Sequence, residues 1–335
     1  MSKRISIVSL LTLLLPVVWA ITSTQSSLTV ARLYGDEGEK MVGGLAVEAQ
    51  ADELTPRGVW VWGEDVVTDP TAQSIFLTFT QSKDLTEAYL NAYSLLPNKA
   101  NQIKDFIVRA KTTGTEVELL AGDPTWALTP NHPVALGFVQ QVITFTESIT
   151  GGAARPVAVH LDIEPYVLAE WGSSQDAIIT QYLDLLNGVK QELAASTAPL
   201  TLTVDIPFWF DTITTTYKNA SKPLNQHVQD IVDRIVIMDY RDFAEGSDGI
   251  IDHAQNEVNY AQSIPKEVVI GVETNKVEPE KITFFEEGEA TMETELALVK
   301  QYYQVSPAFH GFAIHDYAGY WALCSEYVYL PIILK

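Results

Sequence analysis

The chain has 335 residues, of which 47% are hydrophobic and 19% are charged, a balance typical of one large or two small globular domains. Its formal net charge is -22 at pH 7. Such an acidic surface repels nucleic acid and anionic lipid, so we expect neither as a partner, and it suits a neutral or cationic substrate.

The N-terminus is expected to be a targeting segment that is not part of the fold. Lys3 and Arg4 precede an apolar stretch that ends at Trp19, and the small residue Ala20 completes a cleavage site. We therefore interpret residues 1–20 as a secretory signal peptide and expect a secreted or periplasmic protein. Association with a membrane is expected only if this segment stays uncleaved.

Residues 21–56 show no sustained hydrophobic period, and we predict that they form a weakly structured leader. From there, β-rich apolar runs alternate with helical stretches, so we assign residues 57–335 to one domain. The helical stretches include Asn101–Thr112, Val134–Thr150, Gln175–Ala195 and Glu293–Tyr303. The β-rich runs are GVWVWGE at Gly58, EAYLNAY at Glu87, VELLAGD at Val117, VAVHLDIE at Val157, LTLTVDIPF at Leu200, RIVIMDY at Arg234, EVVIGVE at Glu267 and FHGFAIHD at Phe309.

This alternation of strands and helices favours a parallel sheet. Eight strand candidates fit a (β/α)8 TIM barrel, an α/β fold that typically takes ~250 residues. A doubly wound open sheet is the alternative, but no glycine-rich phosphate loop follows the first strand. We therefore predict a barrel, in which the carboxyl ends of the strands form the active-site face.

The fourth β-rich run, VAVHLDIEPY at residues 157–166, carries the densest chemistry in the chain. His160, Asp162 and Glu164 stand at every second position, and a strand sends alternate side chains to the same face. Pro165 cannot donate to a strand ladder, so we predict that the strand ends there. One imidazole and two carboxylates should therefore meet at the mouth of the barrel. An ion-paired strand end is the simpler interpretation.

Most of the other predicted strands also end in a polar side chain. Because these ends share one face of a barrel, we expect Asp162, Glu164, Tyr240, Glu273 and His315 to line one pocket. The polar strand ends are Glu64, Asp123, Glu164, Asp205, Tyr240, Glu273 and His315.

Aromatic residues follow several of the same strands, and rings beside carboxylates suit sugars. The alternative is ordinary packing of the barrel and helices. We assign Trp62, Trp126, Tyr166 and Tyr317 to substrate binding. We expect packing to account for Trp60, Phe210 and Trp321.

Glycoside hydrolysis uses two carboxyl groups in different environments, one protonated and one ionised. The sequence offers two such pairs. Asp162 and Glu164 lie on one predicted strand, whereas Glu164 and Glu273 lie across the barrel on the fourth and seventh strands.

The run HLDIEP resembles the fourth-strand signature of family-18 glycoside hydrolases, the chitinase-like barrels, whose pattern is D-x-x-D-x-D-x-E. The aligned positions are Val157, His160, Asp162 and Glu164, of which the last two match. The resemblance implies that Glu164 is the general acid and that Asp162 supports it. It also implies a carbohydrate ligand and no cofactor.

Further along the chain, Met238-Asp239-Tyr240 resembles the sixth-strand M-x-Y of that family, whose Tyr helps to hold the acetamido group of the substrate. The sequence departs from the family at Arg241, where the family has an acid, and at His315, where it has a Trp. We assign Tyr240 and Glu273 to the catalytic set. The further substrate contacts are assigned to His160, Asp205, Arg241 and His315.

Two weaker resemblances accompany this one. Glu164-Pro165 with Glu273 is similar to the retaining clan whose acid/base follows strand four and whose nucleophile ends strand seven, although Ile163 stands where that clan has Asn. The set HLDIEPY, MDYRD, GVET and IHDY also resembles uncharacterised exported bacterial barrels.

Two other functions fit the same residues. His160, Asp162, Glu164 and His315 together offer the ligand types of a metal-dependent hydrolase. A barrel that binds sugars without cleaving them would keep the aromatic residues and tolerate loss of Glu164. The sequence carries no signal of oligomeric state.

Overall fold

The structure is a computed structural model in which residues 55–325 are described. The predicted signal peptide, residues 1–20, lies outside the described residues. So does the predicted leader, residues 21–56, apart from its last two positions.

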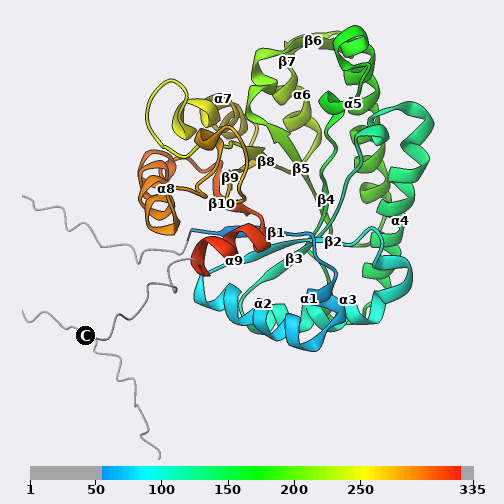
Figure 1. The fold of residues 1–335 in the computed structure, drawn as a ribbon. Helices are drawn as coiled ribbons and strands as arrows, with labels where there is room; N and C mark the ends of the chain where they lie inside the picture. The colour runs from blue at the N-terminus through cyan, green and yellow to red at the C-terminus, as the bar shows by residue number, and fades with distance from the viewer. Residues whose placement is uncertain (1–54, 326–335) are drawn as a thin grey trace, which may run out of the picture. The chain divides into compact units, whose positions relative to one another are not determined.

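Eight parallel strands close into a barrel, which confirms the predicted (β/α)8 fold (Figure 1). Every neighbouring pair in the barrel runs parallel, in the order β1-β10-β9-β8-β5-β4-β3-β2. The strands are β1 (Arg57–Val61), β2 (Glu87–Asn91), β3 (Glu116–Ala121), β4 (Ala158–Leu161), β5 (Thr201–Pro207), β8 (Arg234–Met238), β9 (Glu267–Glu273) and β10 (Phe309–His315).

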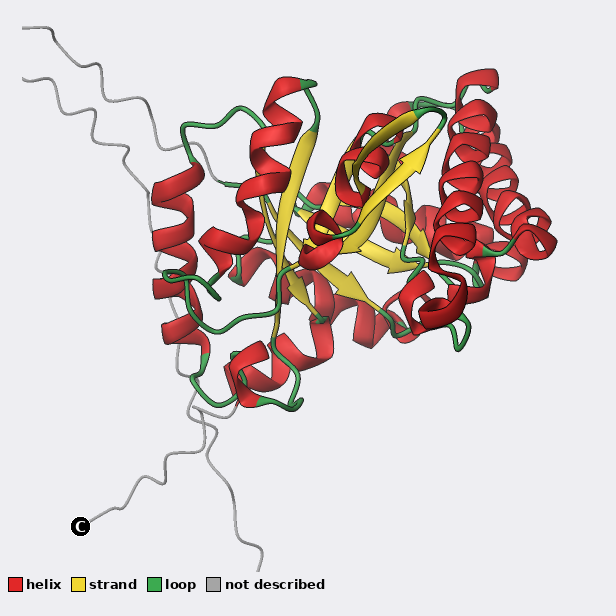
Figure 2. Ribbon diagram, turned by 90° about the horizontal axis from the view of Figure 1, so that it is seen from above, coloured by secondary structure: helices red, strands yellow, loops and turns green. Residues whose placement is uncertain are grey.

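Helices surround the barrel and enclose the strands when the domain is seen from above (Figure 2). They are α1 (Asp65–Thr68), α2 (Pro70–Ser82), α3 (Leu96–Thr112), α4 (His132–Ser148), α5 (Trp171–Ala195), α6 (Leu224–Ile231), α7 (Ile250–Ser263), α8 (Glu289–Tyr303) and α9 (Tyr317–Ser325). Among the described residues, none of these helices has the length and apolar character needed to cross a membrane.

The observed helices begin earlier than the sequence predicts. Helix α3 starts at Leu96 and α4 at His132, and each has a proline in its first turn. A proline in the first turn loses no hydrogen bond, and its fixed φ suits the helix. The helix can therefore begin at the proline or just before it. The sequence pattern also missed a two-stranded antiparallel hairpin formed by β6 (Thr214–Tyr217) and β7 (Ala220–Pro223).

Two apolar layers hold the barrel together, one inside it and a larger one between strands and helices. Inside, Trp60 is 1% exposed and meets the ring of Tyr89 edge-on, with 5.4 Å between ring centroids. Phe210 is also 1% exposed, so the predicted packing role of both Trp60 and Phe210 is confirmed. Trp321 on α9 also packs, with 5.4 Å between the centroids of its ring and that of Phe79, but 43% of its surface stays exposed.

Candidate functional site

The carboxyl end of β4 places the two central carboxylates of the site. Strand β4 ends at Leu161, earlier than predicted, and Pro165 opens a short 3-10 turn. The extended backbone nevertheless continues past the strand, since the amide of Asp162 donates to the carbonyl of Ala121 on β3 at 3.1 Å.

A glycine in β3's following loop allows this close approach. A Cβ added to Gly122 would lie 1.6 Å from the carbonyl oxygen of Asp162, a distance that no real contact permits. Gly122 therefore sets the position of Asp162 and, through it, of Glu164.

We expect Gly122→Ala to destabilise the protein by about 1–3 kcal/mol or more, because the backbone of the loop that carries both carboxylates must shift. The measurement is the free energy of unfolding in urea. Gly137→Ala is the matched control, since a Cβ there meets nothing within 4 Å and alanine favours the helix. Equal stability of the two variants would contradict this account of Gly122.

Glu164 is held by a neighbouring tyrosine. The hydroxyl of Tyr166 donates a hydrogen bond to Oε1 of Glu164 at 2.8 Å. The ring of Tyr166 in turn packs edge-on against Trp209, with 5.0 Å between centroids. Tyr166, which the sequence suggested as a substrate contact, thus orients the carboxyl group. Among residues 55–325, no side chain donates a hydrogen bond to Oε2 of Glu164.

Asp162 lies in a different environment from Glu164. Its Oδ1 is buried and has no hydrogen-bond partner. Burial and the nearby charges of Asp205 and Glu164 raise the pKa of Asp162 to about 8. Asp162 as a whole is half-buried, but a buried carboxylate oxygen without a donor is costly, so both observations favour the neutral acid at pH 7.

Beneath Asp162 lies an ionic group that we call the buried histidine cluster, formed by Glu118, His160 and Asp205. His160 is 0% exposed, with Nδ1 2.8 Å from Oε2 of Glu118 and Nε2 2.9 Å from Oδ1 of Asp205. The indole of Trp60 donates to the other oxygen of Asp205 at 3.1 Å. Each ring nitrogen of His160 thus faces a carboxylate oxygen, although the Nδ1 contact with Glu118 lacks the geometry of a hydrogen bond. Because ionised carboxylates only accept hydrogen bonds, this arrangement favours a proton on both nitrogens.

The charge of His160 follows from this geometry. Burial alone would lower its pKa, but Asp205 and Glu118 outweigh that effect and raise the pKa of His160 to about 10. His160 and Asp205, which is 2% exposed, offer almost no surface to a substrate. We therefore assign both of these predicted substrate contacts an internal role.

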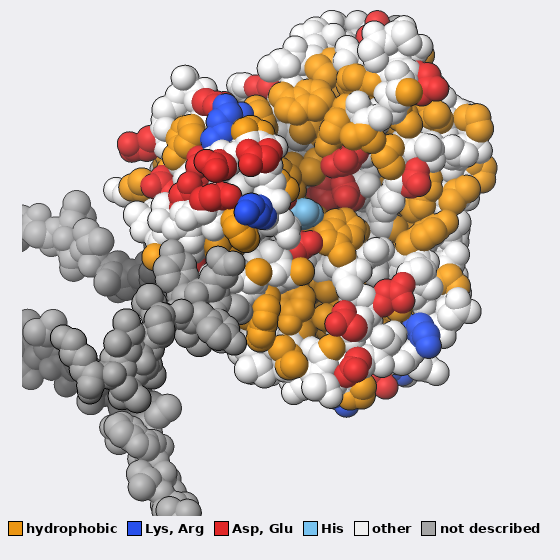
Figure 3. Space-filling view, viewed as in Figure 1, with side chains coloured by type: hydrophobic (Ala, Val, Ile, Leu, Met, Phe, Trp, Pro, Cys, Tyr) orange, Lys and Arg blue, Asp and Glu red, His pale blue; other side chains and the backbone are white. Residues whose placement is uncertain are grey.

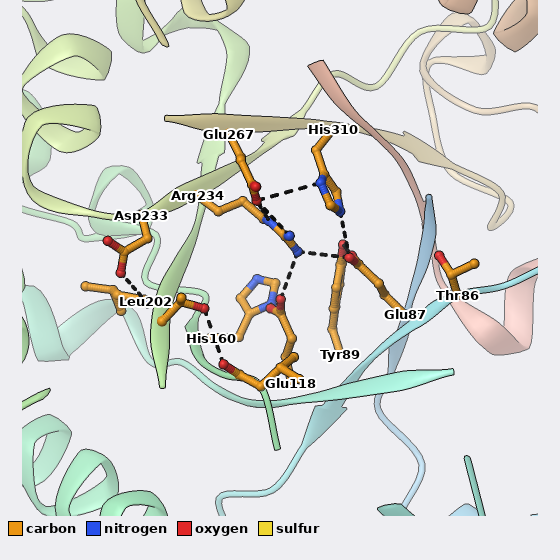
Figure 4. Close-up of polar contacts among 12 residues, drawn as sticks. Thr86, Glu87, Tyr89, Glu118, His160, Leu202, Asp233, Arg234, Glu267 and His310 are labelled. Carbon is orange, nitrogen blue, oxygen red and sulfur yellow. Dashed lines mark hydrogen bonds and ion pairs between the residues drawn. The ribbon is translucent and has the colours of Figure 1, made fainter. Parts of the chain in front are cut away.

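The cluster continues towards the amino end of the barrel, where Arg234 lies among three glutamates (Figure 4). Arg234 contacts Glu118 at 3.1 Å and Glu87 at 3.0 Å, and it also pairs with Glu267. A cavity of about 520 Å³ opens against these residues. The amino-terminal face of such barrels serves stability rather than chemistry, and the ion pairs of Arg234 fit that role.

These charges predict that stability falls as the pH rises above neutrality. The folded protein keeps protons that the unfolded chain releases, on Asp162 between pH 3.8 and about 8 and on His160 between pH 6.5 and about 10. The stability that each bound proton contributes is therefore fully present below the pKa of the unfolded chain, and it is lost as the pH rises through the pKa of the folded protein. Thermal melts from pH 6 to pH 10 should show a falling Tm, and a Tm that rises over this range would contradict the assignment.

Glu273 and His315 form a second hydrogen-bonded pair at the carboxyl ends of β9 and β10. Oε2 of Glu273 lies 2.8 Å from Nδ1 of His315. The other oxygen, Oε1, accepts hydrogen bonds from the amide of Thr274 and from the amide and side chain of Asn275, at 2.7 to 2.9 Å. Glu273 is 4% exposed, and this full set of donors suits a positioning role better than that of a nucleophile.

The far side of His315 contacts Trp62. The indole N–H of Trp62 donates to Nε2 of His315 at 3.2 Å, which requires a lone pair on that nitrogen and favours the neutral ring. Burial also favours the neutral ring, but Glu273 outweighs it and raises the pKa of His315 above its usual value. Protonation of His315 therefore breaks its bond to Trp62.

Tyr240, directly after β8, lies in the same region. Its ring is tilted against His315 with 5.8 Å between centroids. Burial, followed by the charges of Glu273, Asp205 and Asp162, raises the pKa of Tyr240 well above its usual value. These contacts bring Tyr240 together with the ends of β4, β9 and β10. That the predicted residues line one substrate pocket remains our prediction.

Three other predicted substrate contacts lie in packing or ion pairs. Arg241 donates to the carbonyl of Tyr240 and to Asp248, each at 2.7 Å. Trp126 is 4% exposed and packs against the rings of Tyr93 and Phe138. Tyr317 packs against Phe76 and Phe79 of α2, with 4.9 and 5.5 Å between the ring centroids. We leave Arg241, Trp126 and Tyr317 out of the proposed site.

In the space-filling view, acidic side chains and one histidine gather at the centre of the visible face (Figure 3). Hydrophobic side chains border them. This face thus brings acidic and hydrophobic side chains together.

No protein-family model matches the sequence, and no curated protein matches it significantly. Among solved structures, the barrel is similar to a chitinase from Bacteroides thetaiotaomicron, with 13% identity over 79% of this chain and 90% of that chain and a TM-score of 0.51. The fold is therefore a (β/α)8 barrel similar to that of a chitinase.

Two further matches have lower TM-scores. The spore cortex-lytic enzyme SleL of Bacillus megaterium QM B1551 is 12% identical over 80% of this chain and 73% of that chain, with a TM-score of 0.48. A mutant GH18 chitinase from Cycas revoluta in complex with (GlcNAc)4 is 12% identical over 80% of this chain and 97% of that chain, with a TM-score of 0.49.

The residues suggested for a metal site do not converge on one. Within residues 55–325, no group of three or more His, Cys, Asp or Glu side chains is arranged to hold a metal ion. Both nitrogens of His160 face carboxylates, and both nitrogens of His315 are engaged by Glu273 and Trp62. These residues do not fit a metal-dependent hydrolase, and we propose no metal.

Sequence reasoning missed the role of Glu118, which completes the buried histidine cluster. Strand parity contained the signal, because Glu118 and Leu120 share one face of β3 and Leu120 packs with Trp60 inside the barrel. It also missed Trp209 as the support of Tyr166, since no pattern in the sequence relates the loops after β4 and β5.

Proposed function

We propose that this protein is a glycoside hydrolase that acts on an oligo- or polysaccharide, with Glu164 as the proton donor to the glycosidic oxygen. The observation that carries the proposal is the geometry of Glu164. Its carboxyl stands at the carboxyl end of β4, with one oxygen fixed by Tyr166 and the other left for the transferable proton. This is the face on which barrel enzymes place their chemistry. The likeness of the fold to a chitinase supports the same choice.

The supporting residues act through position and charge. Asp162 is the neutral neighbour of Glu164, Glu273 holds His315, and Tyr240 faces the same region. Because Glu273 is saturated with donors, we do not assign it the nucleophile. Glycosidases without a free second carboxylate use a group of the substrate itself, and that route suits this site.

Two half-buried tryptophans are the proposed sugar contacts. Trp62 lies against His315, and Trp209 lies against Tyr166, so each ring adjoins a polar residue of the site. Sugar rings stack on such flat apolar faces while their hydroxyls bond to nearby polar groups. The net charge of -22 favours neutral or cationic glycans over acidic ones.

A glycan-array screen followed by release of reducing ends from each hit tests the proposal. Cleavage of a bound glycan supports it. Binding without cleavage by any hit would instead favour the alternative, a barrel that binds sugars without cleaving them. The saturated Glu273 is the observation on which that alternative rests.

We also propose that the protein is exported, secreted or periplasmic, on the strength of the N-terminal sequence alone. N-terminal sequencing of the protein recovered outside the cytoplasm should begin after Ala20. Recovery only in a membrane fraction with an intact N-terminus would indicate an uncleaved anchor.

A further inference from the structure

Asp162 is unusual because its side chain receives little help from the protein. Its Oδ1 is buried and has no hydrogen-bond partner. An ionised carboxylate at this position would carry a negative charge that no donor stabilises, whereas a neutral carboxylic acid is itself a hydrogen-bond donor. The geometry therefore calls for a proton on Asp162.

Asp205 on β5 has the opposite environment. One of its oxygens lies 2.9 Å from the imidazolium of His160, and the other accepts the indole N–H of Trp60 at 3.1 Å. Both partners are fully buried or nearly so, which leaves this ion pair little screened by water. The negative charge is thus held on Asp205, and of these two neighbouring carboxyl groups the half-buried Asp162 is the one left to carry a proton.

We propose that the His160–Asp205 ion pair is a positioning device: it fixes a negative charge beside Asp162 and so keeps Asp162, two residues before the acid Glu164, a neutral O–H donor within the site. This inference rests on the proposed function of Glu164. It makes His160 and Asp205 positioning residues, because neither reaches the surface where a substrate binds.

The groups around Asp162 support this order of effects. Leu161 of β4 pairs with Val204 of β5, so the next residues along these neighbouring chains, Asp162 and Asp205, lie side by side. After burial, Asp205 is the largest influence that raises the pKa of Asp162, and Glu164 follows, whereas His160 and His315 act in the opposite direction. The charged and titratable groups facing Asp162 are Asp205 of β5, His160 of β4, His315 of β10, and Glu164, Tyr166, Tyr182 and Tyr240.

The test is a pH titration of the aspartate carboxyl carbons by ¹³C NMR, with Asp162 assigned by the signal that Asp162→Asn removes. In the wild-type protein we expect the midpoint of Asp162 near pH 8. In Asp205→Asn, which keeps the shape of the side chain and removes its charge, the midpoint should fall by about one pH unit or more.

Glu118→Gln is the matched control. It removes one charge from the same cluster on the side of His160 that faces Arg234, and Glu118 is not among the main influences on the pKa of Asp162. We expect a much smaller shift of the Asp162 midpoint than in Asp205→Asn. Equal shifts in the two variants would overturn the proposal.

The wild-type titration also decides the matter without any variant, since a midpoint near pH 4 for Asp162 would overturn the inference even if Asp205→Asn failed to fold. The titration needs no substrate, so it separates this inference from the proposed function. If Asp162 titrates near pH 8 but the protein cleaves no glycan, the inference about His160 and Asp205 stands and the proposed activity is rejected. If the protein cleaves a glycan but Asp162 titrates near pH 4, the activity stands and the inference is rejected.

Discussion

Replacing Glu164 by Gln should lower turnover about 10²-fold or more on whichever glycan the protein cleaves, the scale typical of a positioned acid. The amide keeps the shape of the side chain and can still accept the hydrogen bond from Tyr166. It cannot give a proton to a leaving oxygen at the pH of the reaction. Because Trp62 and Trp209 are untouched, binding of the glycan should survive.

The measurements are kcat from release of reducing ends and Kd from calorimetry on the same preparation. Glu170→Gln is the matched control, because Glu170 lies exposed just downstream of Glu164 and, within residues 55–325, its hydrogen bonds are those that its backbone carbonyl accepts from Ser173 and Ser174. We expect its kcat to match the wild type. Parental turnover in Glu164→Gln would remove Glu164 from the mechanism, and equal loss in both variants would point to damage of the loop.

The alternation in VAVHLDIEPY was enough to predict the placement of the central residues. Strand period alone puts Asp162 and Glu164 on the side of the chain opposite the buried Ile163, and the structure shows that arrangement. The same reasoning predicted the barrel, because each β-rich run was followed by a helical stretch. Sequence patterns were sufficient for features that are determined within a single strand or helix.

What each polar residue contacts could not be predicted in the same way. His160 was expected at the mouth, but its partners are Glu118 of β3 and Asp205 of β5, and only the register between strands brings them together. Arg241 was expected to meet substrate, but Asp248 lies near enough to bind it. Contacts between distant segments decided these cases, and the sequence pattern does not contain them.

The buried histidine cluster makes a strong prediction about stability. His160→Gln should reduce the free energy of unfolding by about 3–5 kcal/mol, because it leaves Glu118 and Asp205 buried without the cation between them. The cost arises from uncompensated charge rather than lost volume, since glutamine is close to histidine in size. The difference in the free energy of unfolding is measured by urea unfolding, monitored by tryptophan fluorescence, at pH 6, where the imidazolium is fully formed.

A second substitution distinguishes charge from packing in this cluster. If uncompensated charge is the cause, adding Asp205→Asn to His160→Gln should recover part of the loss, because it removes one of the two stranded carboxylates. Asp205→Asn alone should destabilise the protein, since it takes an acceptor charge away from a buried imidazolium. The two substitutions should therefore couple favourably in a double-mutant cycle. If the losses of unfolding free energy in the two single variants simply add in the double variant, His160 contributes through packing rather than charge. The charge on Asp205 would then need another source of stabilisation.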